Sequence, residues 1–218
     1  MRILKLLILL LLLNSCQKKE VQLPKLGVKG VTDVYNTSKI WIFFNVVKGD
    51  TVGVFNKNNK IADTNLIFNI DKRLPIKEVL PRIMKVKHDA LNALVHKTVD
   101  KQFYLSYADT ISNTFALYDF TDTQYIFTPK DNKTLLDTIK KDPVIIDIRK
   151  NEILLNNVRM DNLKDSIQNL FINDSLHKKT LLLRFRNDIS YNRYLTIRSQ
   201  FYNDGYSIKN IEYIYNVE

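Results

Sequence analysis

The residue most suited to covalent chemistry is Cys16, the only thiol in the chain, at the point where an apolar stretch gives way to a charged one. Arg2 and Lys5 make the start of the chain basic, and Leu6–Leu13 is an unbroken aliphatic run. A basic head, a short apolar run and a small-residue cleavage point are the anatomy of a secretory signal. The run is too short to cross a bilayer, which takes about 20 apolar residues. We therefore predict a signal peptide over residues 1–15.

The segment Leu13-Asn14-Ser15-Cys16 resembles the bacterial lipobox, a leucine followed by two mostly small residues and a cysteine. The resemblance implies diacylglycerol transfer to the Cys16 sulfur, cleavage before Cys16, and acylation of the new amine, for instance with palmitate. Two or three acyl chains anchor a protein stably where one does not. The alternative for Cys16 is a buried core residue, but a core cysteine has no reason to lie at the end of a signal. Gln17, where an inner-membrane lipoprotein tends to carry Asp, favours the outer membrane of the cell envelope.

The composition is that of a chain with a real core and a scattered positive charge. Hydrophobic residues make up 45% of the sequence, with only 5 Gly and 5 Pro, which argues against a fibre or a disordered chain. The net charge is +10, and it falls to +8 when Arg2 and Lys5 are removed with the signal. A nucleic-acid binder concentrates its charge in a patch, so nucleic acid is not an expected partner. The excess charge is explained by solubility, or by weak attraction to anionic envelope material.

No other chemistry-bearing motif is evident. The histidines are His88, His96 and His177, and none has a second ligand at the short helical spacing of a zinc site. The chain contains no G-x-S-x-G elbow and too few glycines for a phosphate-binding loop. We expect no catalytic residue, no metal and no cofactor. A glycosidase would need two carboxylates, and sequence spacing cannot locate such a pair.

The sequence divides into a tether and a first α+β block. Residues 16–38 are polar and are predicted to be a lipidated cysteine with a flexible tether. Apolar periodicity in residues 39–130 predicts one helix, with Pro81 inside it kinking it or splitting off its first turn. The predicted elements of this block are strands Lys39–Val47, Thr51–Phe55 and Thr64–Ile70, the helical stretch Leu74–Thr98, and strands Lys101–Tyr107, Thr114–Phe120 and Gln124–Thr128.

A polar linker, residues 131–142, leads to a second block, residues 143–218, with the order β-β-α-β-α-β. Its predicted elements are strand Val144–Arg149, strand Ile153–Asn156, helix Asp161–Asn173, strand Thr180–Arg186, a helix from Tyr191 that Gly205 ends, and strand Ser207–Tyr215. The predicted fold class is α+β, built as two small two-layer α/β-sandwich blocks.

The second block resembles the periplasmic domain of the ExbD/TolR family over about a third of the chain. The matching residues are Ile145–Ile148, Ile153–Asn157, the helix around Leu163, Leu181–Phe185, Asp188, Tyr191, Gly205 and Ile211–Tyr215. The resemblance implies a module that dimerises and, in TolR-like members, contacts peptidoglycan. Members that use the proton gradient carry an acid in a transmembrane helix. Ile3–Leu13 contains no acid, so proton translocation is not carried over.

Four residues are candidates for partner binding on this pattern: Asp188, Tyr191, Arg184 and Arg186. The alternative for Asp188 is helix capping and turn formation, and the alternative for Tyr191 is a place in the core. Arg184 and Arg186 suit an anionic polymer, or simply form the solvated face of a strand.

The first block is interpreted as a degenerate copy of the second, as an unrelated small α+β block, or as part of one continuous domain. In the repeat interpretation, Phe103–Phe120 aligns with Leu182–Phe201 through Asp109 and Asp188. Altogether the sequence predicts a non-catalytic, membrane-anchored envelope lipoprotein. It would bind a protein partner or peptidoglycan, pair with itself through strand edges, and serve an ExbB/ExbD-type energised transport system. The alternative is an envelope hydrolase that acts on cell wall or glycan.

Overall fold

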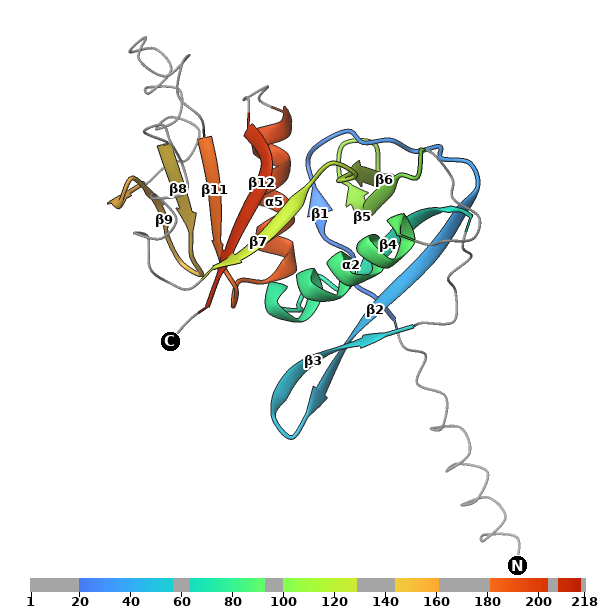
Figure 1. Cartoon of the computed structure of the whole chain (residues 1–218), viewed down its shortest axis with the longest axis horizontal. Helices are drawn as coiled ribbons and strands as arrows, with labels where there is room; N and C mark the ends of the chain where they lie inside the picture. The colour runs from blue at the N-terminus through green and yellow to red at the C-terminus, as the bar shows by residue number, and fades with distance from the viewer. Residues whose placement is uncertain are drawn as a thin grey trace, which may run out of the picture.

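The computed structural model describes residues 20–56, 63–92, 100–128, 144–160, 181–203 and 208–216. These residues form two six-stranded sheets and two helices, so the predicted mixture of helices and strands is confirmed (Figure 1). Several predicted features lie outside the described residues: the signal peptide 1–15, Cys16, the linker 131–142, the helix Asp161–Asn173 and Gly205.

The first sheet has parallel strands at its centre and hairpin partners at its sides. Its strands are β1 (Lys25–Leu26), β2 (Thr37–Val47), β3 (Asp50–Phe55), β4 (Asn65–Ile70), β5 (Phe103–Asp109) and β6 (Thr114–Asp119). The order is β3-β2-β4-β5, with β1 beside the end of β5 and β6 on the other edge of β5. The pairs β2·β4 and β4·β5 are parallel, and the pairs β2·β3 and β5·β6 are antiparallel.

Like the first sheet, the second sheet has parallel strands at its centre. Its strands are β7 (Gln124–Thr128), β8 (Val144–Ile148), β9 (Ile153–Leu155), β10 (Val158–Arg159), β11 (Leu181–Arg186) and β12 (Ile208–Tyr215), in the order β10-β9-β8-β11-β12-β7. The pairs β8·β11, β11·β12 and β12·β7 are parallel, and β8·β9 is antiparallel. β7, predicted as part of the first block, therefore belongs to the second sheet. Its partner is distant in sequence, which is why local periodicity could not assign it.

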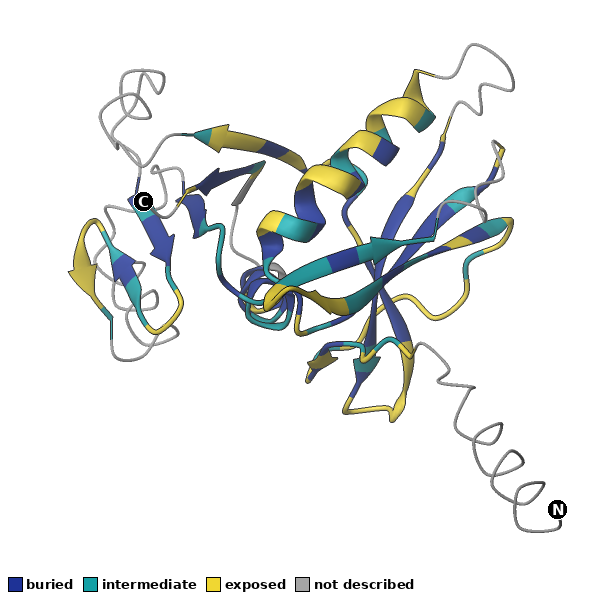
Figure 2. Cartoon of the chain, turned by 90° about the horizontal axis from the view of Figure 1, so that it is seen from below, coloured by how far each residue is buried: buried dark blue, intermediate teal, exposed yellow. Residues whose placement is uncertain are grey.

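Each half has one described helix that follows a central strand. α2 (Ile76–Leu91) follows β4, and α5 (Tyr191–Asn203) follows β11. α2 is buried along one side and exposed along the other (Figure 2). Pro81 lies inside α2 without splitting off a first turn.

The two sheets share one hydrophobic core. A single cluster of buried side chains includes residues of both helices and of both sheets, among them Ile42, Phe68, Leu80, Phe185 and Leu195. Burial of this kind is the main favourable term in folding. The two halves are therefore one folding unit rather than two separately packed blocks.

The segment predicted to be a flexible tether is packed from Gln22 onward. Leu26 is 2% exposed, and its strand β1 pairs with β5. The backbone of Val31 pairs with that of Leu117, and the Tyr107 hydroxyl donates to the Val28 carbonyl at 3.1 Å. A spacer between membrane and fold would therefore have to end near Gln22.

The repeat alignment through Asp109 and Asp188 is wrong. Phe103–Phe120 holds two antiparallel strands, β5 and β6, whereas Leu182–Phe201 holds a strand and a helix. A strand followed by a helix, as in β11 and α5, occurs in the first half at β4 and α2 instead.

Candidate functional site

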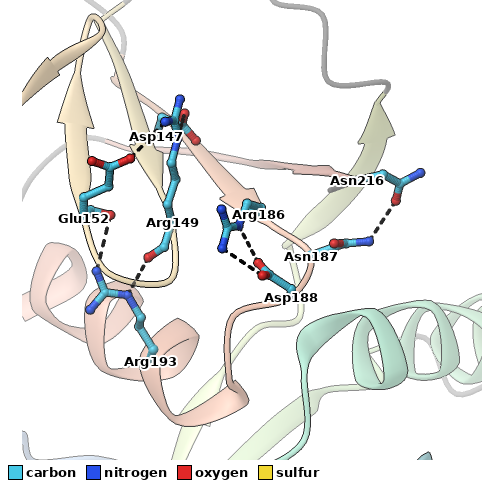
Figure 3. Close-up of polar contacts among 8 residues, drawn as sticks. All are labelled: Asp147, Arg149, Glu152, Arg186, Asn187, Asp188, Arg193 and Asn216. Carbon is cyan, nitrogen blue, oxygen red and sulfur yellow. Dashed lines mark hydrogen bonds and ion pairs between the residues drawn. The ribbon is translucent and has the colours of Figure 1, made fainter. Parts of the chain in front are cut away.

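Charged side chains gather where β8 and β11 end and α5 begins. We call this cluster the charged end; its members are Asp147, Arg149, Glu152, Arg186, Asp188 and Arg193 (Figure 3). β8 and β11 are parallel, so their carboxyl ends meet at one edge of the sheet. In open α/β sheets, ligands bind beyond the carboxyl ends of the strands.

Arg149 is held between two acids. Its Nε donates to Asp147 Oδ2 at 3.0 Å and its Nη1 to Glu152 Oε1 at 2.9 Å. Partial burial alone would lower the pKa of Arg149, but the Asp147 and Glu152 carboxylates together raise it overall. The side chain of Arg149 remains 37% exposed, so the guanidinium is oriented and still reachable from solvent.

Arg186 forms a bidentate ion pair with Asp188. Nε donates to Asp188 Oδ1 at 2.5 Å and Nη2 donates to Asp188 Oδ2 at 2.8 Å. These hydrogen bonds raise the pKa of Arg186. Paired donors of this kind add geometric specificity as well as energy. The two side chains are 26% and 30% exposed, so this pair also lies at the surface.

Arg193 supports the charged end from α5. Its Nε donates to the Arg149 carbonyl at 2.8 Å and its Nη2 to the Glu152 carbonyl at 3.4 Å, which ties the β8–β9 turn to the helix. Burial lowers the pKa of Arg193 from its ordinary value. The Arg193 N–H donates to Ser190 Oγ at 3.2 Å, a side-chain cap on the first turn of α5.

Two of the four predicted partner-binding residues lie at the charged end, and two do not. Asp188 and Arg186 are partly exposed there, and Asp188 binds Arg186 instead of capping α5. Tyr191 is 0% exposed inside the core, so in this conformation it cannot touch a partner. Arg184 is 3% exposed, and its guanidinium lies 4.0 Å from the centre of the Tyr215 ring.

Sequence reasoning missed four members of the charged end: Asp147, Arg149, Glu152 and Arg193. A signal for Asp147 existed, because it interrupts the aliphatic strand Val144–Ile148 two residues before an arginine. A buried acid so placed needs a cationic partner.

The loops that precede the two helices cap each other. Pro75 pairs with Ser190 in an isolated antiparallel bridge, and Pro75 gives α2 no side-chain cap. Four backbone hydrogen bonds join the loops: Tyr191 N–H to Leu74 O (2.7 Å), Ile76 N–H to Ile189 O (2.9 Å), Lys77 N–H to Asn187 O (2.9 Å) and Asn192 N–H to Lys72 O (3.0 Å). The first N–H groups of a helix lack partners within the helix. Here carbonyls of the other half supply them, so these helix starts are closed to a bound anion.

A second polar cluster lies inside the core. Arg198 Nε donates to Glu212 Oε1, and Tyr194 Oη donates to Glu212 Oε2 at 2.8 Å. Tyr125 Oη lies 2.9 Å from Tyr194 Oη. Burial alone would lower the pKa of Arg198, but the Glu212 carboxylate, with smaller contributions from the surrounding tyrosines, raises it overall. Glu212 is 2% exposed, so this cluster is structural rather than a surface site.

A shallow pocket of about 320 Å³ lies at the turn between β5 and β6. Its acid, Asp109, accepts hydrogen bonds from the N–H groups of Ile111 at 2.7 Å and Ser112 at 3.2 Å. Burial alone would raise the pKa of Asp109, but these bonds lower it. The carboxylate therefore shapes the turn and is poorly suited to donate a proton.

In the part of the chain that the structure describes, no three His, Cys, Asp or Glu side chains come close enough to hold a metal ion. No described helix is long and apolar enough to cross a bilayer. No family model matches the chain, no curated protein matches its sequence, and no solved structure matches its fold.

Proposed function

We propose that this chain is a non-catalytic lipoprotein of the cell envelope, anchored through Cys16, whose charged end binds a ligand that carries both carboxylate and ammonium groups. The stem peptides of peptidoglycan have that chemistry, and so does a peptide segment of a protein partner. The observation that carries the proposal is the pair of oriented, partly exposed arginines, Arg149 and Arg186, at one sheet edge.

Both arginines have donors to spare. The hydrogen bonds described above use Nε and Nη1 of Arg149 and Nε and Nη2 of Arg186, and the side chain of Tyr215 also interacts with Arg149. A guanidinium already fixed by an acid loses little conformational entropy when it binds a second carboxylate. The partly exposed acids beside these arginines, Glu152 and Asp188, suit an ammonium group of the same ligand and disfavour a polyanion.

Self-association through a strand edge is the second part of the proposal. β7 pairs only with β12 among the described strands, so its other edge presents unpaired backbone groups. Ile126 and Phe127 on this strand are 39% and 47% exposed. A second copy that adds its own β7 would satisfy the backbone groups and cover these side chains.

A tandem repeat is the third part. The strand order β3-β2-β4-β5 and the order β9-β8-β11-β12 share the same parallel and antiparallel pairs. Each loop also contains an ion pair at the same place. Its two members lie four and two residues before the bridged residue, which is Pro75 in one loop and Ser190 in the other. In the first loop the acid Asp71 precedes Arg73, whereas in the second loop Arg186 precedes the acid Asp188. These correspondences support two copies of one unit.

Binding at the charged end is tested by co-sedimentation of the full chain with purified peptidoglycan sacculi, and by capture with ExbB-type channel proteins. We expect the variant Arg149→Ala/Arg186→Ala to lose about tenfold or more in affinity, because a hydrogen bond to a charged group contributes about 1.5–3 kcal/mol. The matched control is Arg159→Ala, an exposed arginine on β10 of the same sheet. Binding of wild type to neither partner would remove the docking proposal, and equal loss in the control would show mere charge attraction.

A further inference from the structure

The β2–β3 hairpin extends beyond the sheet that contains it (Figure 1). The last residue of β2 that pairs with β4 is Ile42, opposite Ile70. The five residues Phe43–Val47 pair only with β3, and a two-residue turn, Lys48-Gly49, closes the hairpin. Both turn residues have positive φ, 52° and 88°. This is the turn whose twist matches that of a hairpin, so the projection is a regular structure.

The base of the hairpin is fixed to the rest of the fold. The Arg73 guanidinium lies 4.2 Å from the centre of the Phe44 ring, and the Gly53 N–H donates to Glu78 Oε2 at 3.3 Å. A Cβ at Gly53 would lie 3.2 Å from Ile42 Cγ2, so the α2 end of the molecule packs closely here. Below this base, the hairpin tip, residues 45–52, has no such support.

Each face of the hairpin tip carries an exposed valine among the polar residues Asn45, Lys48, Asp50 and Thr51. Val46 and Val47, which point to opposite sides of the strand, are 53% and 49% exposed. Val52, across from Asn45, adds a partly exposed apolar side chain to the Val47 side. Exposed apolar side chains that gather on a projection mark a site of contact with another surface.

The chain enters the fold at the same end of the sheet. The Gln22 N–H donates to Asp71 Oδ2 at 3.2 Å, and the Lys72 N–H donates to the Gln22 carbonyl at 2.8 Å. Asp71 directly follows Ile70, the residue beside which the hairpin begins to project. Gln22 lies six positions after Cys16, and six extended residues span at most about 20 Å.

The length of the hairpin projection matches the reach of the chain between Cys16 and Gln22. Five residues of β-strand rise about 17 Å, so the tip projects about as far from the level of Ile70 as the chain between Gln22 and Cys16 can reach. We propose that the hairpin tip docks into the head-group region of the bilayer that holds the Cys16 lipid, with Val46 and Val47 entering the apolar boundary. The inference rests on the proposed lipid anchor.

A small apolar tip is enough for such docking because the anchor makes the contact intramolecular. A tether raises the effective concentration of the second contact to the millimolar range for short linkers. Two valines would bind weakly on their own, and the opposite charges of Lys48 and Asp50 leave the tip with no net attraction to anionic head groups. Because the hairpin reaches beyond the other described elements in Figure 1, the charged end stays clear of the membrane.

The test uses the full-length lipidated protein, reconstituted in vesicles of phosphatidylethanolamine and phosphatidylglycerol with a share of chain-brominated phosphatidylcholine. Trp41 is the only tryptophan, so Trp41→Phe provides a silent background. In that background we expect Val47→Trp to be quenched several-fold more than the control Val158→Trp, which places the same substitution on β10, where Val158 is 70% exposed. Val46→Trp provides a second reporter on the other face of the tip.

The outcomes separate the two proposals. Equal quenching of tip and control reporters, with mass spectrometry showing the lipid on Cys16, would overturn the docking inference and leave the anchor standing. An unmodified, uncleaved amino terminus in the native cell would overturn the anchor itself. A Val46→Cys variant that forms a disulfide with a second copy on the vesicles, with no quenching at the tip, would assign the tip to a protein contact and refute docking.

Discussion

In the second half of the molecule Arg198 and Glu212 pair inside the core, whereas the first half has Ile83 and Leu105 at the matching places. The match follows from spacing and register. The buried residues of α2 are Ile76, Val79, Leu80, Ile83 and Val86, and those of α5 at the same intervals are Tyr191, Tyr194, Leu195, Arg198 and Phe201. Leu105 lies opposite Phe68 of β4, as Glu212 lies opposite Leu183 of β11.

The difference shows what a buried ion pair contributes here. An apolar pair fills the same place in the first half, and buried ion pairs are often no more stabilising than apolar replacements. Arg198 also reaches the other half: Nη2 donates to Thr123 Oγ1, and the guanidinium lies 4.8 Å from the centre of the Tyr118 ring. The pair therefore marks the point where the chain crosses from the first sheet to the second.

The largest effect is expected from Arg198→Ile. Loss of one partner leaves the Glu212 carboxylate, which is 2% exposed, without its cation. Breaking a buried pair in this way costs about 3–5 kcal/mol. The free energy of unfolding, measured by urea denaturation, checks the value.

The double variant Arg198→Ile/Glu212→Leu gives the second half the residues of the first. We expect it to recover most of the lost stability, because no unpaired charge is left in the core. If the double variant is as unstable as the single one, the two halves are not interchangeable at this place and the comparison fails.

The exchanged ion pairs of the two loops predict a smaller and unequal effect. Asp71 is 0% exposed and binds the Arg73 side chain as well as the N–H groups of Gln22 and Arg73, whereas Asp188 is 30% exposed and binds Arg186. We expect Asp71→Asn to cost about 1.5–3 kcal/mol and Asp188→Asn less than about 1 kcal/mol.

The same comparison has a pH dependence. Burial alone would raise the pKa of Asp71, but the hydrogen bonds from Arg73 and Gln22 lower it overall. A carboxylate with a depressed folded pKa adds stability above its unfolded pKa, about 3.9, and loses it as the pH falls through the folded pKa. The gap between wild type and Asp71→Asn in unfolding free energy should therefore begin to narrow below about pH 4 and close as the pH falls through the lower folded pKa. A gap that persists in acid would mean that the charge of Asp71 is not what stabilises the loop.

The packed amino-terminal segment, whose strand β1 pairs with β5 of the first half, predicts a third effect. A Cβ at Gly30 would lie 2.2 Å from the Tyr107 hydroxyl and 2.7 Å from the Leu117 carbonyl oxygen, whereas the nearest atom to a Cβ at Gly27, Thr110 Oγ1, is 3.7 Å away. Overpacking costs about 1–3 kcal/mol, so Gly30→Ala should lower the melting temperature. Gly27→Ala should leave it unchanged or slightly raised. Equal, unchanged melting temperatures would favour the free tether that the sequence suggested.

Local patterns predicted most of the elements but not their assembly. The helix spacing of Ile76–Val86 and the aliphatic run of β11 are local signals, and both elements form as predicted. The pairing of β7 with β12 joins residues about 87 apart in sequence, and no periodicity carries such information. The sequence analysis did not predict the pairing of Arg198 with Glu212. Each of these charged residues stands where the pattern of its helix or strand calls for an apolar one: Arg198 is at helical spacing from Tyr194, and Glu212 is two residues before Ile214. Two opposite charges out of pattern in facing elements predict a buried pair.

The smallest effect concerns Lys87 of α2, which contacts the segment of chain that crosses from the first sheet to the second. Lys87 Nζ donates to the carbonyls of Phe120 (3.1 Å), Thr121 and Thr123 (2.9 Å). Arg198 reaches the same stretch from the other half and stays charged. Burial lowers the pKa of Lys87 to about 8, with Arg198 adding to the shift and Asp122 opposing it. The two halves therefore differ in that only the lysine titrates in mildly alkaline solution.

The sign of the effect follows from proton binding. Between about pH 8 and the unfolded pKa of about 10.4, the unfolded chain binds a proton at Lys87 that the folded chain does not. The contribution of Lys87 to the free energy of unfolding therefore rises with pH across this window. Wild type should gain stability relative to Lys87→Met from pH 8 to 10. The matched control is Lys85→Met, which removes an exposed lysine from the same helix. Parallel pH profiles for wild type and both variants would mean that Lys87 keeps an ordinary pKa. The crossing chain would then be held equally by a charged group from each half.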